Sequence, residues 1–157
     1  METAYIALGS NLPSPAGSPQ ETLDAAINKL AELGHLTAQS SYYSTEPIGY
    51  ADQPEFLNAA IALETPLDPQ TLLDRLLEIE RSFGRDRSHG IPNGPRTLDL
   101  DILLYGDYVL NTQALQLPHP RMAQRSFVLL PMAEIAPKLI HPELRRSMTQ
   151  LLQDLSK

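Results

Sequence analysis

The chain contains no cysteine, and this absence excludes several classes of chemistry at once. Thiol catalysis, disulfides, thiolate zinc sites and iron–sulfur clusters all require cysteine side chains. The sequence also lacks any apolar run of the roughly 18 residues that a membrane span requires, and its first residues do not have the basic start and apolar run of a signal peptide. We therefore expect a soluble, cytoplasmic protein with an apolar core, for which 42% hydrophobic residues are sufficient.

The chain also lacks an excess of basic residues. Its formal net charge is −7, which argues against a general nucleic-acid binder. Nine of the twelve basic residues are arginines, and four of these fall between Arg81 and Arg96. A local arginine cluster in an acidic chain favours a site for a small anionic ligand, with a solvated charged loop as the alternative.

Two glycine-rich phosphate-binding motifs are missing as well. The sequence contains neither G-x-x-x-x-G-K-[ST] nor G-x-G-x-x-G, and Gly9-Ser10-Asn11 is too short to replace either motif. Any nucleotide would therefore be held by side chains and a metal ion rather than by a glycine-rich backbone loop.

Hydrophobic periodicity and turn residues predict four main strands and two main helices. The strands are expected at residues 3–8, 36–45, 56–65 and 96–105. One helix is predicted to begin after the cap Ser18 and to stop at Gly34, and a second to begin after Asp68 and to stop at Gly84. A proline-rich tail of loops and helix follows, ending in an amphipathic segment, 147–155.

This order of elements, β-α-β-β-α-β, indicates a ferredoxin-like α+β fold. It predicts an antiparallel sheet in which the second and third strands can pair, with the helices packed on one face and extra elements at the C-terminus. The length of 157 residues fits a single domain spanning residues 1–157.

The most informative pattern is the run Gly94–Asp101, GPRTLDLD. On a strand, Asp99 and Asp101 share one face roughly 6–7 Å apart, while Leu98, Leu100 and Ile102 point to the core. Two carboxylates this close repel each other unless a cation lies between them, and oxygen ligands of this kind suit Mg²⁺. A polar strand face that meets solvent is the alternative interpretation.

Arginines provide the complementary charge. Arg85 and Arg87 lie in a segment rich in glycine, proline and asparagine, and Arg96 lies beside the aspartates. A guanidinium group can donate two parallel hydrogen bonds to the oxygens of a phosphate. Arginines on a mobile segment can close over a bound nucleotide. We expect the segment 85–95 to be mobile without ligand, and Arg81 to be a solvated charge on the second helix.

Four motifs in this order resemble the 6-hydroxymethyl-7,8-dihydropterin pyrophosphokinase family of folate biosynthesis. They are YIALGSNL (residues 5–12), DQPEFLNAA (52–60), GPRTLDLDI (94–102) and the group Pro118, His119, Arg125 and Phe127. The resemblance covers nearly the whole chain. It implies a ferredoxin-like α+β enzyme that transfers the pyrophosphoryl group of ATP to the hydroxymethyl group of a reduced pterin and releases AMP.

The resemblance also assigns roles to residues. Asp99 and Asp101 match carboxylates that hold two Mg²⁺ ions, and Arg85 and Arg96 match catalytic, phosphate-contacting arginines. The residues matched to the ATP side are Glu80, Arg87, Arg96, Ile102, His119 and Arg125. The residues matched to the pterin side are Thr45, Glu46, Ile48, Phe56, Asn58 and Phe127, with the two phenylalanines stacking on the ring and Asn58 reading its polar edge. The implied partners are ATP and the pterin alone, bound by a monomer, with no nucleic acid and no membrane.

The chain departs from the commonest family pattern at Leu77, Asn93 and Pro120, positions that bear on the nucleotide contacts and on loop closure. Two other functions use the same residues. A metal-dependent nucleotidyltransferase would use the aspartate pair but release pyrophosphate instead of AMP. An ATP-binding regulatory module would bind the nucleotide without turnover.

Overall fold

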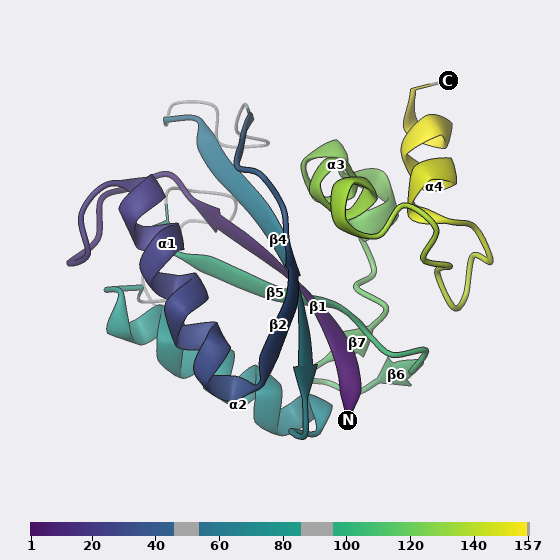
Figure 1. Cartoon of the computed structure of the whole chain (residues 1–157), viewed down its shortest axis with the longest axis horizontal. Coiled ribbons are helices and arrows are strands. Elements are labelled where there is room, and N and C mark those ends of the chain that lie inside the picture. Colours follow the sequence, from purple (N-terminus) through teal and green to yellow (C-terminus); the bar gives the residue numbers. More distant parts are fainter. Residues whose placement is uncertain (46–53, 86–95, 157) are drawn as a thin grey trace.

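The computed structural model describes residues 1–45, 54–85 and 96–156, and its centre is a five-stranded antiparallel sheet (Figure 1). The strands are β1 (Glu2–Ser10), β2 (His35–Gln39), β3 (Tyr43–Thr45), β4 (Phe56–Thr65) and β5 (Asp99–Tyr105). Their order across the sheet is β2-β4-β1-β5, and β3 pairs with the beginning of β4. The predicted ferredoxin-like α+β class and the pairing of the second and third predicted strands are therefore confirmed.

Two helices cover the first face of the sheet, and both begin where the sequence predicts. In α1 (Pro19–Leu30), Ser18 and Glu21 form a reciprocal capping box, and in α2 (Pro69–Ser82) the carboxylate of Asp68 accepts the hydrogen bond of Thr71 N. These caps satisfy backbone donors that would otherwise be unpaired at the first turn of each helix. Buried leucines of both helices pack on the side chains of β1, β4 and β5 that face them.

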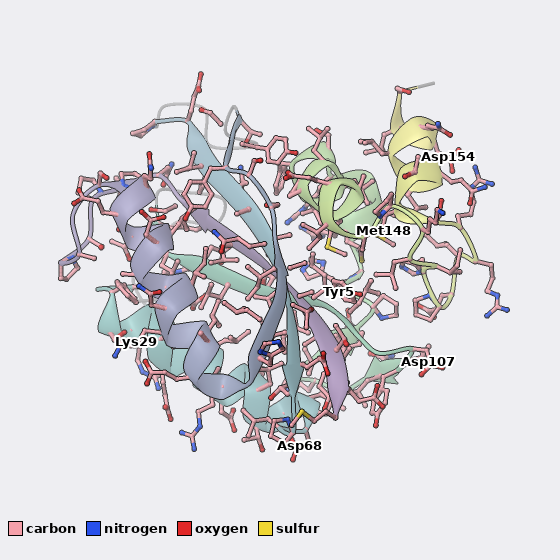
Figure 2. The ribbon with its side chains drawn as sticks, viewed as in Figure 1. Tyr5, Lys29, Asp68, Asp107, Met148 and Asp154 are labelled. Carbon is pink, nitrogen blue, oxygen red and sulfur yellow. The ribbon has the colours of Figure 1, made fainter. Side chains whose placement is uncertain are left out.

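The two predicted helices thus share one face, and the extra C-terminal elements, which the sequence did not place, cover the other face of the sheet. Helix α3 (Ser126–Ile135) packs on β4, and α4 (Met148–Leu155) packs on α3 (Figure 1). They enclose a second apolar cluster, with Met132 and Met148 fully buried. Figure 2 shows Tyr5 of β1 on this side and Lys29 of α1 on the opposite side.

The predicted strand 36–45 is divided into β2 and β3 because Ser40 interrupts the ladder. Ser40 N donates to Ala60 O at 2.9 Å, but Ala60 N donates to the hydroxyl Oγ of Ser40 at 2.9 Å rather than to a strand carbonyl. A side chain therefore replaces the backbone acceptor at this position, and the edge segment gains one residue relative to β4, with Gln39 opposite Ile61 and Tyr43 opposite Asn58.

Short elements complete the structure. They are the 3-10 turns η1 (Ala31–Leu33) and η3 (Met122–Gln124) and the paired strands β6 (Leu110–Asn111) and β7 (Gln116–Leu117). Strand β5 begins at Asp99, three residues after the predicted start. None of the helices in the described ranges is long and apolar enough to cross a membrane.

Candidate active site

A pocket opens on the face of the sheet that carries α3, between the sheet and the beginning of that helix. Its described lining comes from β1, β3, β4, β5, the loop at His119 and the residues around Arg125. The lining residues are Ala7, Leu8, Gly9, Thr45, Phe56, Asn58, Ala59, Arg96, Asp99, Asp101, Leu103, His119, Arg125, Phe127 and Val128. Nine residues that the sequence assigns to the site are among them: Thr45, Phe56, Asn58, Arg96, Asp99, Asp101, His119, Arg125 and Phe127.

Small residues of the central strand make room for the pocket. In the antiparallel register, Asp99 lies opposite Gly9 and Asp101 lies opposite Ala7. Side chains of directly opposed residues project to the same face, so β1 contributes only a methyl group and a hydrogen atom beside the two carboxylates. A Cβ atom at Gly9 would lie 3.2 Å from Asn58 Oδ1, which shows how closely the strand approaches the pocket amide.

One end of the pocket is aromatic and contains a held amide. Phe56 and Asn58 come from the beginning of β4, Thr45 from β3, and Phe127 from the first turn of α3. Asn58 is 7% exposed, and its Nδ2 donates to Thr45 Oγ1 at 2.6 Å. A flat bicyclic ligand with a hydrogen-bonding edge fits such a site, because aromatic faces supply apolar burial and a fixed amide supplies selectivity.

The other end is charged, and Asp99 is its central acceptor. Arg85 Nη1 donates to Asp99 Oδ1 at 2.9 Å, and Arg96 Nη1 donates to Asp99 Oδ2 at 3.1 Å. Leu98, Leu100 and Ile102 are buried in the cluster under α1 and α2, as the alternation along the strand predicts. The acidic pair therefore faces the pocket, and the alternative of a strand face that simply meets solvent does not describe it.

Glu80 and Arg85 support this end from behind. Glu80 is 1% exposed, its carboxylate accepts Leu100 N at 2.8 Å, and it lies 3.8 Å from Arg85 Nη1. Arg85 Nη1 also donates to Leu98 O at 2.8 Å. The buried carboxylate of Glu80 thus joins α2 to β5. Arg85, which follows α2, bonds to Leu98 and Asp99 at the start of β5.

His119 is held with a defined hydrogen-bonding pattern. Its backbone N donates to Leu103 O at 2.9 Å, and its Nδ1 accepts Arg121 N at 3.2 Å. Because Nδ1 is an acceptor here, the ring proton belongs on Nε2, which leaves that atom as a donor. Burial lowers the pKa of His119, the nearby Arg125 and Arg121 lower it further, and Asp99 acts in the opposite direction.

Arg125 links the charged and aromatic ends. It lies at the N-cap of α3, and its guanidinium carbon lies 5.5 Å from the centroid of the Phe127 ring. A guanidinium over an aromatic face is attracted by the ring quadrupole. The contact orients the arginine at the border between the two ends.

Several assigned residues do not line the pocket. Arg85 bonds directly to Asp99 from behind the pocket, and Glu80 contacts Arg85 and Leu100 N. Ile102 belongs to the core cluster on the opposite face of the sheet, 3% exposed. Glu46, Ile48 and Arg87, and with them the predicted mobile segment beyond Arg85, lie outside the described residues.

The sequence interpretation missed six lining residues, all of them apolar or glycine: Ala7, Leu8, Gly9, Ala59, Leu103 and Val128. Leu103 lies on this face by the same strand alternation that places Asp99 and Asp101 there, so that periodicity could have found it. The residue whose face differs from the alternation is Leu104, because the register of β1 and β5 shifts so that Leu104 pairs with Tyr5 and Ile102 with Ile6. The extra residue places Leu103 and Leu104 in the same cluster under α3. No residue type marks this bulge in the sequence, whereas Val128 follows directly after Phe127.

The donor set is suited to Mg²⁺. The described part of the chain has no group of three or more histidine, cysteine, aspartate or glutamate side chains that could hold a metal ion. The pocket instead offers two carboxylates on adjacent same-face positions of β5. One or two carboxylates completed by substrate phosphates and water is the usual protein environment of this ion.

Comparison with known proteins gives consistent matches over nearly the whole chain. Residues 5–137 match the family model described as 7,8-dihydro-6-hydroxymethylpterin-pyrophosphokinase. A protein of Haemophilus influenzae named 2-amino-4-hydroxy-6-hydroxymethyldihydropteridine pyrophosphokinase is 44% identical, with 100% of this chain and 92% of that protein covered. A protein of the same name from Pseudomonas aeruginosa is 47% identical, with 91% and 86% covered.

Solved structures show the same fold. The crystal structure of wild-type Plasmodium falciparum HPPK-DHPS superposes with a TM-score of 0.75 at 15% sequence identity. The match covers 98% of this chain and 44% of that chain, so this chain corresponds to under half of the longer protein.

Proposed function

The chain belongs to the 7,8-dihydro-6-hydroxymethylpterin pyrophosphokinase family, and from this premise we propose that the pocket beside α3 is its active site. The enzyme transfers the pyrophosphoryl group of ATP to the hydroxymethyl oxygen of 6-hydroxymethyl-7,8-dihydropterin and releases AMP, a step of folate synthesis. The single observation that supports the location is that one pocket combines an aromatic end with a held amide and an acidic pair with basic side chains.

The pterin is assigned to the aromatic end. Phe56 and Phe127 cover the two faces of the bicycle, and Asn58 bonds to its polar edge. The support is the burial of Asn58 and its bond to Thr45 Oγ1, which fix the amide before any ligand arrives. A fixed amide rejects a ring that lacks the matching donor and acceptor, because the buried polar group would then be unpaired. Glu46 and Ile48 complete this end in the same proposal.

The polyphosphate is assigned to the charged end. Arg96, His119 and Arg125 line it, and Arg85 bonds to Asp99 beside it. The resemblance assigns Arg87 to the same end in this proposal. Arginine forks match phosphate oxygens in pairs, and His119 Nε2–H adds a single donor. The positions of Glu80 and Ile102, behind β5 and in the core, favour supporting roles for both in place of direct ATP contacts.

Magnesium is the metal that ATP-dependent enzymes of this kind use, and we assign two ions to Asp99 and Asp101. The ions neutralise charge on the polyphosphate and shield the two carboxylates from each other. Asp99 accepts bonds from Arg85 and Arg96, so a metal held there would share this carboxylate with the two arginines. Asp101, which faces Ala7, contributes the second carboxylate.

The reaction then requires positioning rather than a dedicated base. The hydroxymethyl oxygen attacks the β-phosphorus of ATP, the bond from that phosphorus to the oxygen of the α-phosphate breaks, and the hydroxyl proton leaves with solvent or a phosphate oxygen. The residues of the pocket hold nucleophile and leaving group in line and stabilise the spreading negative charge. In this proposal the protein is a single domain over residues 1–157 that acts as a monomer on ATP and the pterin alone.

Product analysis tests this function. With ATP, Mg²⁺ and 6-hydroxymethyl-7,8-dihydropterin, we expect one AMP for each diphosphorylated pterin. In Asp99→Ala, kcat should fall by at least about 100-fold, since a charge-stabilising group is lost. Formation of free pyrophosphate with nucleotide transfer would instead indicate a nucleotidyltransferase, and ATP binding without turnover would indicate a regulatory module. Full activity of Asp99→Ala would contradict the location of the site.

A further inference from the structure

The outer wall of the pterin end is a very short strand. In the described part of the chain β3 has three residues and pairs with β4 alone, Tyr43 opposite Asn58 and Thr45 opposite Phe56. Directly opposed residues share a face, so Tyr43 and Thr45 both project to the side of the sheet that carries α3. Such a short edge strand is weakly held by its own ladder, and contacts from outside the sheet must fix its position.

Glu134 of α3 supplies such contacts. Its carboxylate accepts Ser41 N at 3.0 Å, Ser41 Oγ at 3.0 Å and Tyr43 Oη at 2.6 Å. The bond from Tyr43 lowers the pKa of Glu134, and the bond to Glu134 raises the pKa of Tyr43. The carboxylate is therefore ionised near neutral pH and can accept all three donors.

Glu134 and Tyr43 lie on the same two elements, α3 and β3, as the pocket residues Phe127 and Thr45. On α3, Phe127 and Glu134 are two helical turns apart and share a face, separated by roughly 10 Å along the axis. On β3, Thr45 and Tyr43 share a face roughly 6–7 Å apart. Thus Glu134 and Tyr43 join α3 to β3 at one end of their contact, and Phe127 and Thr45 line the pocket at the other.

We propose that Glu134 is a positioning residue for pterin binding, because its carboxylate fixes β3 against α3 and so sets the separation of Thr45 and Phe127. The inference rests on the assignment of the pterin to the aromatic end of the pocket. Glu134 does not line the pocket, and it acts on the substrate only through Ser41, Tyr43 and the strand that follows them.

The same segment offers a matched control. The hydroxyl of Tyr42 donates to a carboxylate oxygen of Asp24, on α1, at the opposite face of the sheet. Tyr42→Phe removes one hydroxyl-to-carboxylate bond from the segment without touching its connection to α3. Tyr43→Phe removes one such bond on the α3 side.

The test is to measure both KM values, kcat and the thermal unfolding midpoint for Glu134→Ala, Glu134→Gln, Tyr43→Phe and Tyr42→Phe. For Glu134→Ala we expect the KM for the pterin to rise about tenfold, the factor that corresponds to a charge-assisted hydrogen bond. The KM for ATP should stay within about twofold, since Asp99, Arg96 and His119 are held by contacts with Arg85 and β5 rather than by β3. Glu134→Gln should recover part of the loss, because its amide oxygen still accepts.

Two results would overturn the proposal. One is an unchanged pterin KM in Glu134→Ala and Tyr43→Phe, and the other is an equal rise in Tyr42→Phe, which would mean that any loosening of the segment suffices. Failure of the proposed function is distinguishable, because it would appear as no AMP formation by the unsubstituted enzyme.

Discussion

His141 shows how one buried side chain can make the stability of the fold depend on pH. It is 5% exposed, and its Nδ1 accepts the backbone N–H groups of Glu143 and Leu144. Burial lowers its pKa from the ordinary value of 6.5. Protonation would place a hydrogen on the nitrogen that accepts both bonds, so the fold favours the neutral ring.

The sign of the effect follows from linkage. Because the folded pKa is below the unfolded one, the stabilisation is complete above about pH 6.5 and is lost as the pH falls from there through the folded value. Chemical denaturation at pH 7.5 and 5.5 should show a smaller loss of stability on acidification in His141→Asn, whose side-chain oxygen can accept the same bonds. An unchanged pH dependence in this variant would contradict the assignment, since His119, whose pKa is also lowered, would then account for all of it.

Some residues of the site can be placed from the neighbouring sequence, and others only from contacts between distant parts of the chain. Asp99 and Asp101 could be placed on one face from the sequence because strand alternation is a rule of backbone geometry. Leu103 obeys the same rule, whereas Leu104 could not be placed, because a bulge in the ladder with β1 brings it to the same face as Leu103. Glu134 could not either, since its partners Ser41 and Tyr43 are distant in sequence and meet it only after α3 packs on the sheet.

Among the elements, the turn at Gly34 illustrates a correct boundary with a different cause. A glycine after a helix usually adopts a left-handed conformation. Gly34 instead has φ of 168°, an extended value, and a Cβ atom there would lie 2.1 Å from Glu64 O. The requirement is for close approach of the chain to the backbone of β4, not for an unusual dihedral angle.

We therefore expect Gly34→Ala to lower the free energy of unfolding by about 2–3 kcal/mol, the range for overpacking against atoms that cannot move aside. Glu32→Ala, at an exposed position of the same turn, should change it by less than about 0.5 kcal/mol. Urea denaturation of the two variants measures the difference. Equal stability of Gly34→Ala and the unsubstituted chain would show that the backbone of β4 yields at this point.

The helices differ in how well the sequence predicts them. Helices α1 and α2 were predictable because capping residues, apolar spacing and terminal glycines agree. Helix α3 was not assigned because Pro131 lies inside it and removes one backbone donor. The burial of Val128, Leu129 and Met132 between the sheet and α4 compensates for this loss, and packing of that kind cannot be read from local propensity.

In the whole molecule, one face of the sheet forms the main apolar core and the other face forms the pocket. The face under α1 and α2 is filled by apolar side chains, including Leu98, Leu100 and Ile102. The face under α3 is filled only in part, and the unfilled portion is the pocket. Because β5 serves both faces, the alternation that builds the core also delivers Asp99 and Asp101 to the site.

We propose that one pocket of this molecule holds the pterin at its aromatic end and the nucleotide at its charged end. The most direct measurement is the pair of KM values for Phe56→Ala and for Arg125→Met. Phe56→Ala should raise the KM for the pterin by about tenfold or more, because an aromatic contact is lost, and should leave the KM for ATP unchanged. Arg125→Met should raise the KM for ATP and leave the KM for the pterin unchanged. An increase of the same KM in both variants, or no change in either, would contradict the account.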